Sequence, residues 1–401
     1  MTNPSCALVL GCMGQDGSLL CKSLLQKGTN VIGITRNSVK TKNHKLLGIS
    51  GETRIFQYDI CDIHSIEKII LKFKPSHIFN LAAQSSVGTS FAQPFETYKS
   101  IIEGTLNLLE ICRRNQYDGK VFFAGSSEVF GETKIPAKIG NSLNHVNPYG
   151  HAKDTSFNLV KMYRTLYELN CMTGILFNHE SNLRSEKFVT QKIIKGAIDT
   201  YKDKKHKISL GNIKIARDWG CAEEYVEAMQ KILNSKKIKD YIISTGELTS
   251  LENFIDIAYK FYDLNWKEHV EINPKYFRKT EIMNSYGDPS EIHKDNGCNA
   301  HFIWEYIPFR GNLHEKSLYP EKFKNGSLEL KVVTLNPCHT THFLLYKVKM
   351  EIKEDTDIDS LYCQILRDVL KMLEEKEKNN LLHYAIGWRS KSNDEIKFST
   401  V

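Results

Sequence analysis

The ten cysteines of this 401-residue chain show no paired spacing and no CxxC motif. Several lie within apolar runs, where reduced thiols usually pack in a core, so neither a disulfide framework nor a structural zinc site is expected. No apolar run follows a basic segment near the N-terminus, and no stretch is long enough to cross a membrane. We therefore expect a cytoplasmic protein without a metal or a membrane partner.

Charge of one sign is not concentrated anywhere in the chain. The formal net charge is +7, from 54 Lys and Arg residues against 47 Asp and Glu residues. The Lys-rich segments at 201–207 and 236–237 are short, as in solvated turns. A nucleic-acid surface needs clustered basic residues, so nucleic acid is not an expected partner, whereas a small anionic ligand suits this charge.

Most of the chain alternates short apolar runs with amphipathic segments, and its length allows two or three domains. Strands are predicted at 7–10, 30–34, 54–58, 77–83, 121–124, 172–177, 207–210 and 241–244. Helices are predicted at 18–27, 65–73, 94–114, around Tyr149, at 192–201, 222–233 and 250–263, and 178–192 is expected to be a loop. This alternation predicts an α/β protein with a doubly wound parallel sheet.

Three regions follow from this pattern. Residues 1–177 are expected to form a Rossmann domain, with its sheet completed by about 205–263, and 178–204 and 264–300 to form smaller substrate-binding inserts. Residues 301–401 are expected to form a C-terminal α+β module after a linker at 310–326: four strands (328–334, 342–350, 383–388 and 395–399) and a helix at 359–378. The Cys338–His342 segment is interpreted as a turn and not as a metal site, because no acidic or thiol partners accompany it.

A glycine-rich turn joins the first predicted strand to the first predicted helix. Gly11, Gly14 and Gly17 have the spacing G-x-x-G-x-x-G within a strand–turn–helix–strand unit, which is typical of pyrophosphate binding at a helix N-terminus. After the second strand stands Arg36, followed by Asn37 and Ser38, instead of the acid that usually binds the ribose of NAD. An arginine there favours the 2′-phosphate of NADP; the alternative is an exposed loop cation.

The candidate chemistry lies between 126 and 153. Tyr149 and Lys153 are four residues apart, so on a helix they share a face, and an ammonium beside a phenol is expected to lower its pKa from roughly 10. Ser126 and Glu128 follow a buried strand and are expected at its carboxyl end, where open α/β sheets place their ligands. Together these groups suit proton abstraction beside a carbinol carbon. The alternatives are a chance Tyr–Lys spacing and a surface position for Glu128.

Several segments, taken together, are similar to one family. These are GQDG (14–17), NLAAQS (80–85), GILFNHES (174–181), FVTQKI (188–193), LGN (210–212), RDWG (217–220), YFR (276–278) and Gly287-Asp288-Pro289. Over about 6–296 the chain resembles the GDP-mannose 4,6-dehydratases, extended short-chain dehydrogenase/reductases that act on a sugar nucleotide.

The resemblance implies a mechanism and a set of contacts. Tyr149, assisted by Lys153, would deprotonate the sugar 4-hydroxyl while hydride leaves C4, Ser126 would hydrogen-bond the 4-oxygen, and Glu128 would take the C5 proton as water leaves C6. For NADP it implies Gly11, Gly14, Gln15, Asp16, Gly17, Arg36, Asp59, Leu81, Ala83, Ser85, Tyr149, Lys153, His179 and Arg184. For the GDP-sugar it implies Ser85, Glu128, Asn178, Val189, Lys192, Gly211, Asn212, Arg217, Arg278 and Glu281.

The chain also departs from the family pattern. Met13 and Ser126 stand where the family usually has threonine, Asn37 replaces a second arginine, and the 182–185 loop lacks the family's Pro-Arg-Arg-Gly. That loop, with Arg184, reaches a neighbouring subunit's cofactor in the family, so a homodimer or homotetramer is implied. The segment after about 300 does not match, which leaves GDP-mannose and a GDP-linked heptose as alternative substrates.

Two other functions remain open on the sequence. An epimerase or 4-ketoreductase could use the same scaffold, but neither needs an acid at the position of Glu128. A non-catalytic sensor of a nucleotide sugar would need none of Ser126, Glu128, Tyr149 and Lys153.

Overall fold

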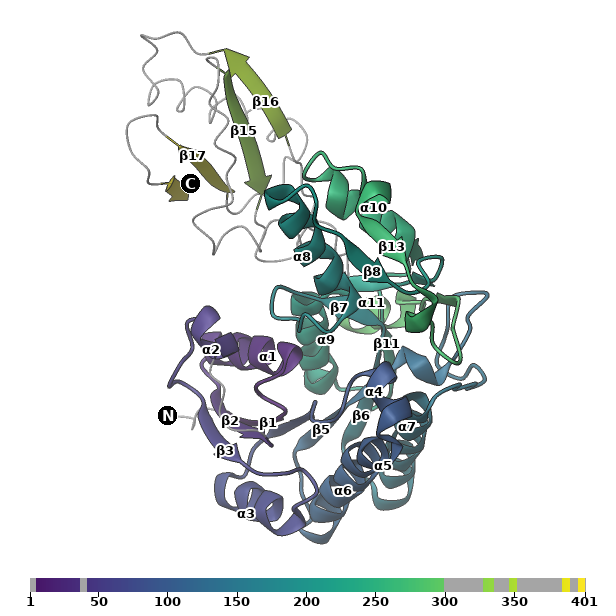
Figure 1. The fold of residues 1–401 in the computed structure, drawn as a ribbon. Helices are drawn as coiled ribbons and strands as arrows, with labels where there is room; N and C mark the ends of the chain where they lie inside the picture. The colour runs from purple at the N-terminus through teal and green to yellow at the C-terminus, as the bar shows by residue number, and fades with distance from the viewer. Residues whose placement is uncertain are drawn as a thin grey trace. The chain divides into compact units, whose positions relative to one another are not determined.

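The structure of this protein is a computed structural model that describes residues 5–36, 42–298, 327–334, 346–351, 384–389 and 396–400. The chain divides into two compact units, residues 1–311 and 312–401. Figure 1 traces the elements of each.

A seven-stranded sheet forms the centre of the first unit, and all its strand pairs are parallel. Across the sheet the strands are β11 (Tyr241–Ile243), β6 (Cys171–Leu176), β5 (Lys120–Ser126), β4 (His77–Asn80), β1 (Cys6–Leu10), β2 (Asn30–Thr35) and β3 (Arg54–Gln57). Their apolar residues are buried because helices cover both faces, as parallel sheets require.

Two hydrophobic clusters hold the helices against the two faces (Figure 1). One face carries α1 (Gln15–Gln26), α9 (Ala222–Asn234) and α11 (Ser290–Asn296), with α2 (Lys42–Leu46) beside α1. The other carries α3 (Ile63–Phe73), α6 (Gly104–Arg114) and α7 (Pro148–Tyr167), with α4 (Val87–Ala92), α5 (Pro94–Tyr98) and the π-helical turn η1 (Lys99–Glu103) leading into α6. The predicted doubly wound sheet is confirmed.

A third cluster builds a smaller layer beyond the carboxyl ends of the strands. It packs α8 (Val189–Lys202) against α10 (Leu251–Lys260). Short strand pairs accompany these helices: β7 (Asn178–Glu180) with β10 (Trp219–Cys221), β8 (Ile208–Leu210) with β13 (Val270–Ile272), and β9 (Ala216–Arg217) with β12 (Thr249–Ser250) and β14 (Asn284–Ser285). Three 3₁₀ turns complete the unit: η2 (Ser127–Val129), η3 (Trp266–Glu268) and η4 (Pro274–Tyr276).

One local prediction is wrong in part. Residues 178–192 were expected to be a loop, but 178–180 form β7, which pairs in parallel with β10, and α8 already begins at Val189. The β7 sequence Asn-His-Glu has no apolar alternation, so its pairing depends on backbone partners about forty residues away.

The second unit contains a four-stranded antiparallel sheet among its described residues. Its order is β16 (Tyr346–Glu351), β15 (Ser327–Thr334), β17 (Tyr384–Arg389) and β18 (Ile396–Thr400). Each of the four predicted strands overlaps one of these, although 342–345 of the second predicted strand lie outside the described residues. The predicted linker, the helix at 359–378 and the turn at 338–342 lie outside the described residues.

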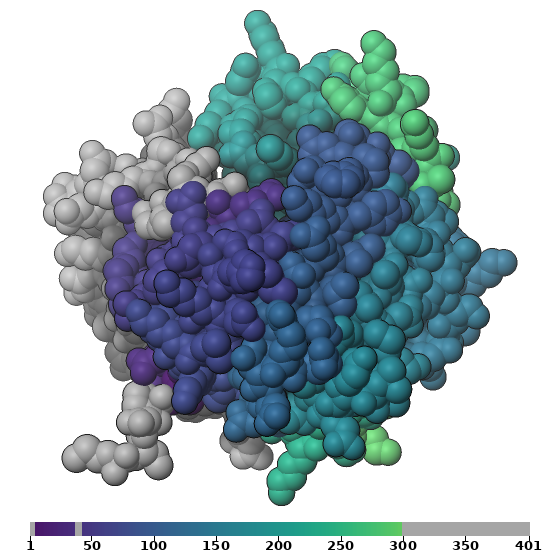
Figure 2. Space-filling model, turned by 90° about the horizontal axis from the view of Figure 1, so that it is seen from below, coloured from purple at the N-terminus to yellow at the C-terminus, as the bar shows by residue number. Residues whose placement is uncertain are grey.

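Segments far apart in the chain lie side by side on the face shown in Figure 2, where purple N-terminal residues adjoin blue and teal ones. Within the part of the chain that the structure describes, no helix is long and apolar enough to span a membrane.

Candidate active site

A cavity of about 440 Å³ lies where the polar residues after β4, β5 and β6 meet α8 and the 276–281 segment. This volume is in the range of small-molecule sites, and the place is where open α/β sheets bind their ligands. Its lining includes most of the predicted site residues: Asp16, Leu81, Ala83, Ser85, Ser126, Glu128, Tyr149, Lys153, Asn178, His179, Arg184, Val189, Lys192, Gly211, Asn212, Arg217, Arg278 and Glu281.

The glycine turn lies at the edge of this cavity and needs two of its glycines for space. Gly11 has φ +86°, and a Cβ there would lie 2.9 Å from the carbonyl carbon and oxygen of Leu81. A Cβ on Gly17 would lie 2.2 Å from Gly11 O, while one on Gly14 would be 3.4 Å from that oxygen. The turn therefore brings bare backbone to the N-terminus of α1, which leaves room for a pyrophosphate. Among these residues only Asp16 lines the cavity itself; Gly11, Gly14, Gln15 and Gly17 stand behind it.

Asp16 and His179 form an ion pair in the cavity wall. Asp16 Oδ2 lies 2.9 Å from His179 Nε2, and His179 Nδ1 lies 2.7 Å from the carbonyl oxygen of Phe177. Gln15 fixes the pair, since its amide donates to Asp16 Oδ1 and to the His179 carbonyl. Burial opposes both charges, but their mutual attraction outweighs it, lowering the pKa of Asp16 to about 2 and raising that of His179.

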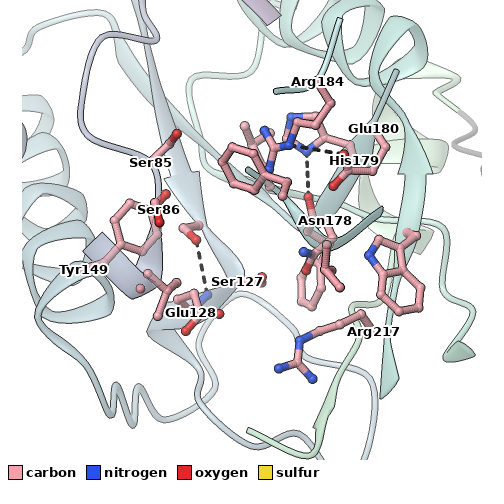
Figure 3. A pocket seen from close by; sticks show the side chains of 18 of the residues that line it. Ser85, Ser86, Ser127, Glu128, Tyr149, Asn178, His179, Glu180, Arg184 and Arg217 are labelled. Atoms are coloured by element: carbon pink, nitrogen blue, oxygen red, sulfur yellow. Dashed lines mark hydrogen bonds and ion pairs between the residues drawn. The ribbon is translucent and has the colours of Figure 1, made fainter. Parts of the chain in front are cut away.

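Arg184 turns toward its own chain's cavity. Its Nε lies 3.2 Å from Glu180 Oε2, and its guanidinium carbon lies 3.6 Å from the Phe188 ring centroid. Burial raises the pKa of Glu180 although Arg184 opposes this shift. Figure 3 shows Arg184, His179 and Glu180 together on one side of the cavity. A contact of Arg184 with a neighbouring subunit stays a prediction.

The predicted Tyr149–Lys153 pair lies on α7, buried in the cavity wall. Burial raises the pKa of Tyr149 to about 12, although the Ser126 hydroxyl partly opposes the rise, and burial lowers the pKa of Lys153 to about 8. The Lys153 ammonium donates to the Ala124 carbonyl at 2.7 Å and lies 5.8 Å from the Tyr149 ring centroid. The expectation that Lys153 lowers the Tyr149 pKa is therefore wrong for the protein alone, because burial dominates and the ammonium is held by a carbonyl.

Glu128 is half-buried and faces the cavity, which rules out the surface alternative. It lies in the turn η2, where its backbone N–H donates to Ser126 Oγ at 3.3 Å. The Asn147 amide donates to Glu128 Oε2 at 2.7 Å. In Figure 3, Glu128 and Tyr149 lie on the same side as Ser85 and Ser86.

Arg217 supplies a buried cation at the other end of the cavity. Only 4% of the residue is exposed, and its Nη1 donates to the carbonyls of Ala216 and Met283. Its Nη2 is buried without a hydrogen-bond partner among the described residues. Burial lowers the pKa of Arg217 although Glu128 opposes the shift. An orphaned guanidinium nitrogen at a cavity wall suits an anionic ligand oxygen.

Neighbouring residues add further polar groups. Lys192 Nζ donates to the Ser209 carbonyl at 2.6 Å and lies 5.0 Å from the Tyr276 ring centroid. The other lining residues of this end are Asn178, Asn212, Arg278 and Glu281. Several cations at one end of a cavity match the charge of a diphosphate.

Besides the glycine-turn residues, two more predicted cofactor residues do not line the cavity. Arg36 is exposed at the end of β2, and Asn37 and Ser38 lie outside the described residues. Asp59 follows β3, where its Oδ1 accepts from the Cys61 N–H at 2.9 Å. Arg36 and Asp59 follow the carboxyl ends of β2 and β3. These positions neither support nor contradict their predicted role in NADP binding.

Sequence reasoning missed several residues of the site. Ser86, Lys187, Phe188 and Tyr276 line the cavity, and Asn147 holds Glu128. Phe188 and Tyr276 lie in the FVTQKI (188–193) and YFR (276–278) segments that resemble the family. Because neighbours of both residues in these segments were predicted to bind the substrate, their place in the site could have been predicted as well. No signal in the sequence connects Asn147 to Glu128.

Among the described residues no three His, Cys, Asp or Glu side chains are grouped as metal ligands would be. The eight described cysteines are free thiols, and Cys338 and Cys363 lie outside the description.

Solved structures share this fold. A Thermotoga maritima UDP-glucose 4-epimerase with UDP-glucose superposes with a TM-score of 0.68 at 21% identity, covering 77% of this chain and 100% of that one. A Bacillus anthracis dTDP-glucose 4,6-dehydratase in complex with NAD has a TM-score of 0.67 at 16% identity, with 77% and 97% covered. The chain therefore has the doubly wound α/β fold of these nucleotide-sugar enzymes, with Tyr149 and Lys153 in one cavity wall.

Sequence comparison is more specific. A family profile described as GDP-mannose 4,6 dehydratase matches residues 8–302. The GDP-mannose 4,6 dehydratase 1 of Arabidopsis thaliana is 39% identical over an alignment of 297 residues that covers 71% of this chain and 82% of the relative. The human GDP-mannose 4,6 dehydratase is 35% identical over an alignment of 310 residues that covers 70% of this chain and 83% of the relative. The chain belongs to the GDP-mannose 4,6-dehydratase family.

Proposed function

We propose that this protein is an NADP-dependent GDP-sugar 4,6-dehydratase that converts GDP-mannose, or a GDP-linked heptose, to its 4-keto-6-deoxy form. The observation that carries the proposal is the placement of Tyr149 and Glu128 on one side of a single cavity, with the glycine turn at its edge. An epimerase or reductase needs the phenol, but only an elimination needs the second proton-transfer group.

The residues present fit a dinucleotide. The bare backbone of the glycine turn and the N-terminus of α1 suit its pyrophosphate, and the turn is packed so closely that a Cβ at Gly11 or Gly17 would overlap neighbouring backbone atoms. A bound nicotinamide would supply the hydride acceptor for C4 and the hydride donor for C6. Asp16, His179 and Arg184, which line the cavity, would contact the nicotinamide half of the cofactor. Arg36 at the end of β2 favours a cofactor that carries a 2′-phosphate.

The protein's own groups divide the proton transfers. Tyr149 takes the proton of the 4-hydroxyl, and the Ser126 hydroxyl beside the phenol hydrogen-bonds the 4-oxygen. The new ketone acidifies the C5–H bond, so Glu128 can remove that proton and pass it to the hydroxyl that leaves C6, which departs as water. The proton that Tyr149 took from the 4-hydroxyl is then available for C5 when C6 is reduced. Burial raises the pKa of Tyr149 to about 12 and the Ser126 hydroxyl opposes the rise, so a positive charge bound beside the phenol would favour its deprotonation.

Recognition of the nucleotide is proposed for the cationic end of the cavity. Arg217 and Lys192 would contact the diphosphate, with Arg278 beside them, and Asn178 and Asn212 would contact neighbouring polar groups. Glu281, which also lines the cavity, would accept hydrogen bonds from a guanine base.

A homodimer or homotetramer is also proposed. Phe95 on α5 and Leu166 on α7 are 74% and 64% exposed, and Met162 on α7 is 40% exposed. Large apolar side chains on adjacent exposed helices favour burial against a second copy. Light scattering of the purified chain would show a single monomeric mass if this is wrong.

The function is tested by incubating the chain with GDP-mannose and NADP+ and analysing the product by mass spectrometry. We expect a product lighter by one water, with no net formation of reduced nicotinamide. A product of unchanged mass would indicate an epimerase, and net use of NADPH with a keto-sugar would indicate a reductase. Binding without any turnover would favour a sensor. Parallel binding titrations with NAD+ and NADP+ would decide the cofactor.

A further inference from the structure

Asn147 occupies a junction between two parts of the site. It lies immediately before α7, the helix that carries Tyr149 and Lys153, and 7% of it is exposed. Its side-chain oxygen accepts from the Gly150 N–H at 2.8 Å, which caps the helix. Its side-chain nitrogen donates to Glu128 Oε2 at 2.7 Å.

This double contact needs an amide. Ser, Thr and Asp cap helices as well as Asn does, so capping alone does not explain the residue. Only the amide offers an acceptor for a backbone N–H and, on the same planar group, a donor for a carboxylate. Aspartate would place a second negative charge against Glu128.

The backbones around this contact are tightly packed. A Cβ on Gly150 would lie 2.8 Å from the Glu128 carbonyl oxygen and 3.1 Å from the His145 Cβ. The first turn of α7 therefore rests directly on η2, and the Asn147 amide adds a side-chain bridge at this contact.

The Asn147 amide binds only Oε2 of the Glu128 carboxylate and leaves Oε1 without this contact. No described residue donates a hydrogen bond to Glu128 Oε1, and Glu128 lines the cavity. We propose that Asn147 is a positioning residue that orients Glu128 for removal of the C5 proton while it starts the helix carrying Tyr149. This inference rests on the proposed dehydratase function.

The role separates the two proton transfers in time. Glu128 acts after C4 has been oxidised, so a displaced carboxylate slows elimination without slowing hydride transfer from C4. Reduced nicotinamide should then accumulate within a single turnover. A merely structural loss at Asn147 would weaken both steps together.

The test compares full-length wild type with N147S and N147D by steady-state kinetics, stopped-flow absorbance of reduced nicotinamide and thermal melting. N147S keeps a capping oxygen but removes the amide nitrogen that donates to Glu128, and its single hydroxyl lies on a shorter side chain; N147D keeps the cap and repels Glu128. We expect kcat for dehydration of GDP-mannose to fall by about tenfold to a hundredfold, with KM changed by less than about threefold. We also expect a larger transient of reduced nicotinamide. If N147S does not fold, the same kinetic measurements on N147D test the proposed role of Asn147.

Asn265 offers a matched control outside the cavity. It caps η3 by accepting from the Lys267 N–H, and its amide donates to Glu268 Oε1 at 2.8 Å, so it makes the same two kinds of contact. N265S should leave both kinetic phases unchanged. Wild-type kcat in N147S and N147D, or equal loss of the oxidation and elimination phases, would overturn the role of Asn147 alone. A wild-type chain that removes no water from any GDP-sugar would overturn the proposed function and this inference with it.

Discussion

The Asp16 carboxylate lies 2.9 Å from His179 Nε2, and this ion pair joins the first turn of α1 to β7 across 163 positions of sequence. The other ring nitrogen of His179 faces the Phe177 carbonyl at 2.7 Å. Since both nitrogens face acceptors, the ring is best satisfied as an imidazolium. The pair thus ties the glycine turn to the layer beyond the sheet.

The first prediction concerns the pH dependence of stability. The folded-state pKa of His179 is raised above its ordinary value of 6.5 because attraction to Asp16 outweighs burial. A raised pKa stabilises the folded state fully below about pH 6.5, and this contribution is lost as the pH rises through the folded-state value. H179Q should therefore cost more stability at about pH 6 than at about pH 9, with a difference on the order of 1 kcal/mol, measured by urea unfolding.

Replacing the partner provides the control. D16N removes the same attraction, so it should show the same direction of pH dependence between about pH 6 and pH 9, and the double variant should add little. At the acid end the Asp16 contribution is fully present above the ordinary pKa of 3.8 and is lost as the pH falls toward the folded-state pKa of about 2. A stability loss in H179Q that is equal at both pH values would contradict the ion pair.

The second prediction concerns Glu128. E128Q keeps the shape of the side chain but removes the base, so GDP-mannose should still bind while dehydration falls by roughly two or more orders of magnitude. Calorimetric titration and product analysis measure the two effects separately. Glu227 on α9 forms an exposed ion pair with Lys231, so E227Q serves as a control with unchanged activity. Activity near the wild-type rate in E128Q would remove Glu128 from the mechanism.

The local parts of the fold were predictable because they depend on neighbouring residues. Gly28 has φ +75° directly after α1, and Ser250 accepts from the Asn253 N–H at the start of α10, as their residue types indicate. Strand–helix alternation located the central sheet for the same reason. Polar β7 could not be predicted, because its pairing with β10 is tertiary.

The candidate site was predictable as a set of residues but not as an electrostatic arrangement. Spacing alone indicated that Tyr149 and Lys153 share a helix face, which the structure confirms. It could not indicate that both would be buried, and burial sets the direction of both pKa shifts. The Asn147–Glu128 contact depends on how the loop before α7 meets η2, which no local pattern encodes.

The third prediction concerns Arg217. Its Nη2 is buried without a described partner, so a bound phosphate oxygen would gain a charge-assisted hydrogen bond without displacing another one. R217M should weaken GDP-mannose binding by roughly tenfold to a hundredfold, since such bonds contribute about 1.5–3 kcal/mol. Calorimetric titration measures the change, with GDP as a second ligand. GDP should lose affinity to a similar extent, because the contact is to the diphosphate.

A matched exposed arginine controls for the loss of charge. Arg113 on α6 pairs with Glu110 at 2.9 Å away from the cavity, so R113M should leave both affinities unchanged. If R217M weakened GDP-mannose but left GDP unaffected, the contact would have to be with the sugar.

The last prediction concerns the glycine turn. A Cβ on Gly17 would lie 2.2 Å from Gly11 O and 2.8 Å from the Cys12 Cα, and both are backbone atoms that cannot rotate away. G17A must therefore shift the start of α1, and overpacking of this kind costs about 1–3 kcal/mol. G14A is the matched comparison, because its Cβ would meet Gly11 O at 3.4 Å, an ordinary contact. Thermal melting of the two variants should show a clear loss for G17A and a small change for G14A, and NADP+ should stabilise G17A less than the wild type because the pyrophosphate cradle has moved. Equal melting temperatures in the two variants would mean that the turn is not packed as described.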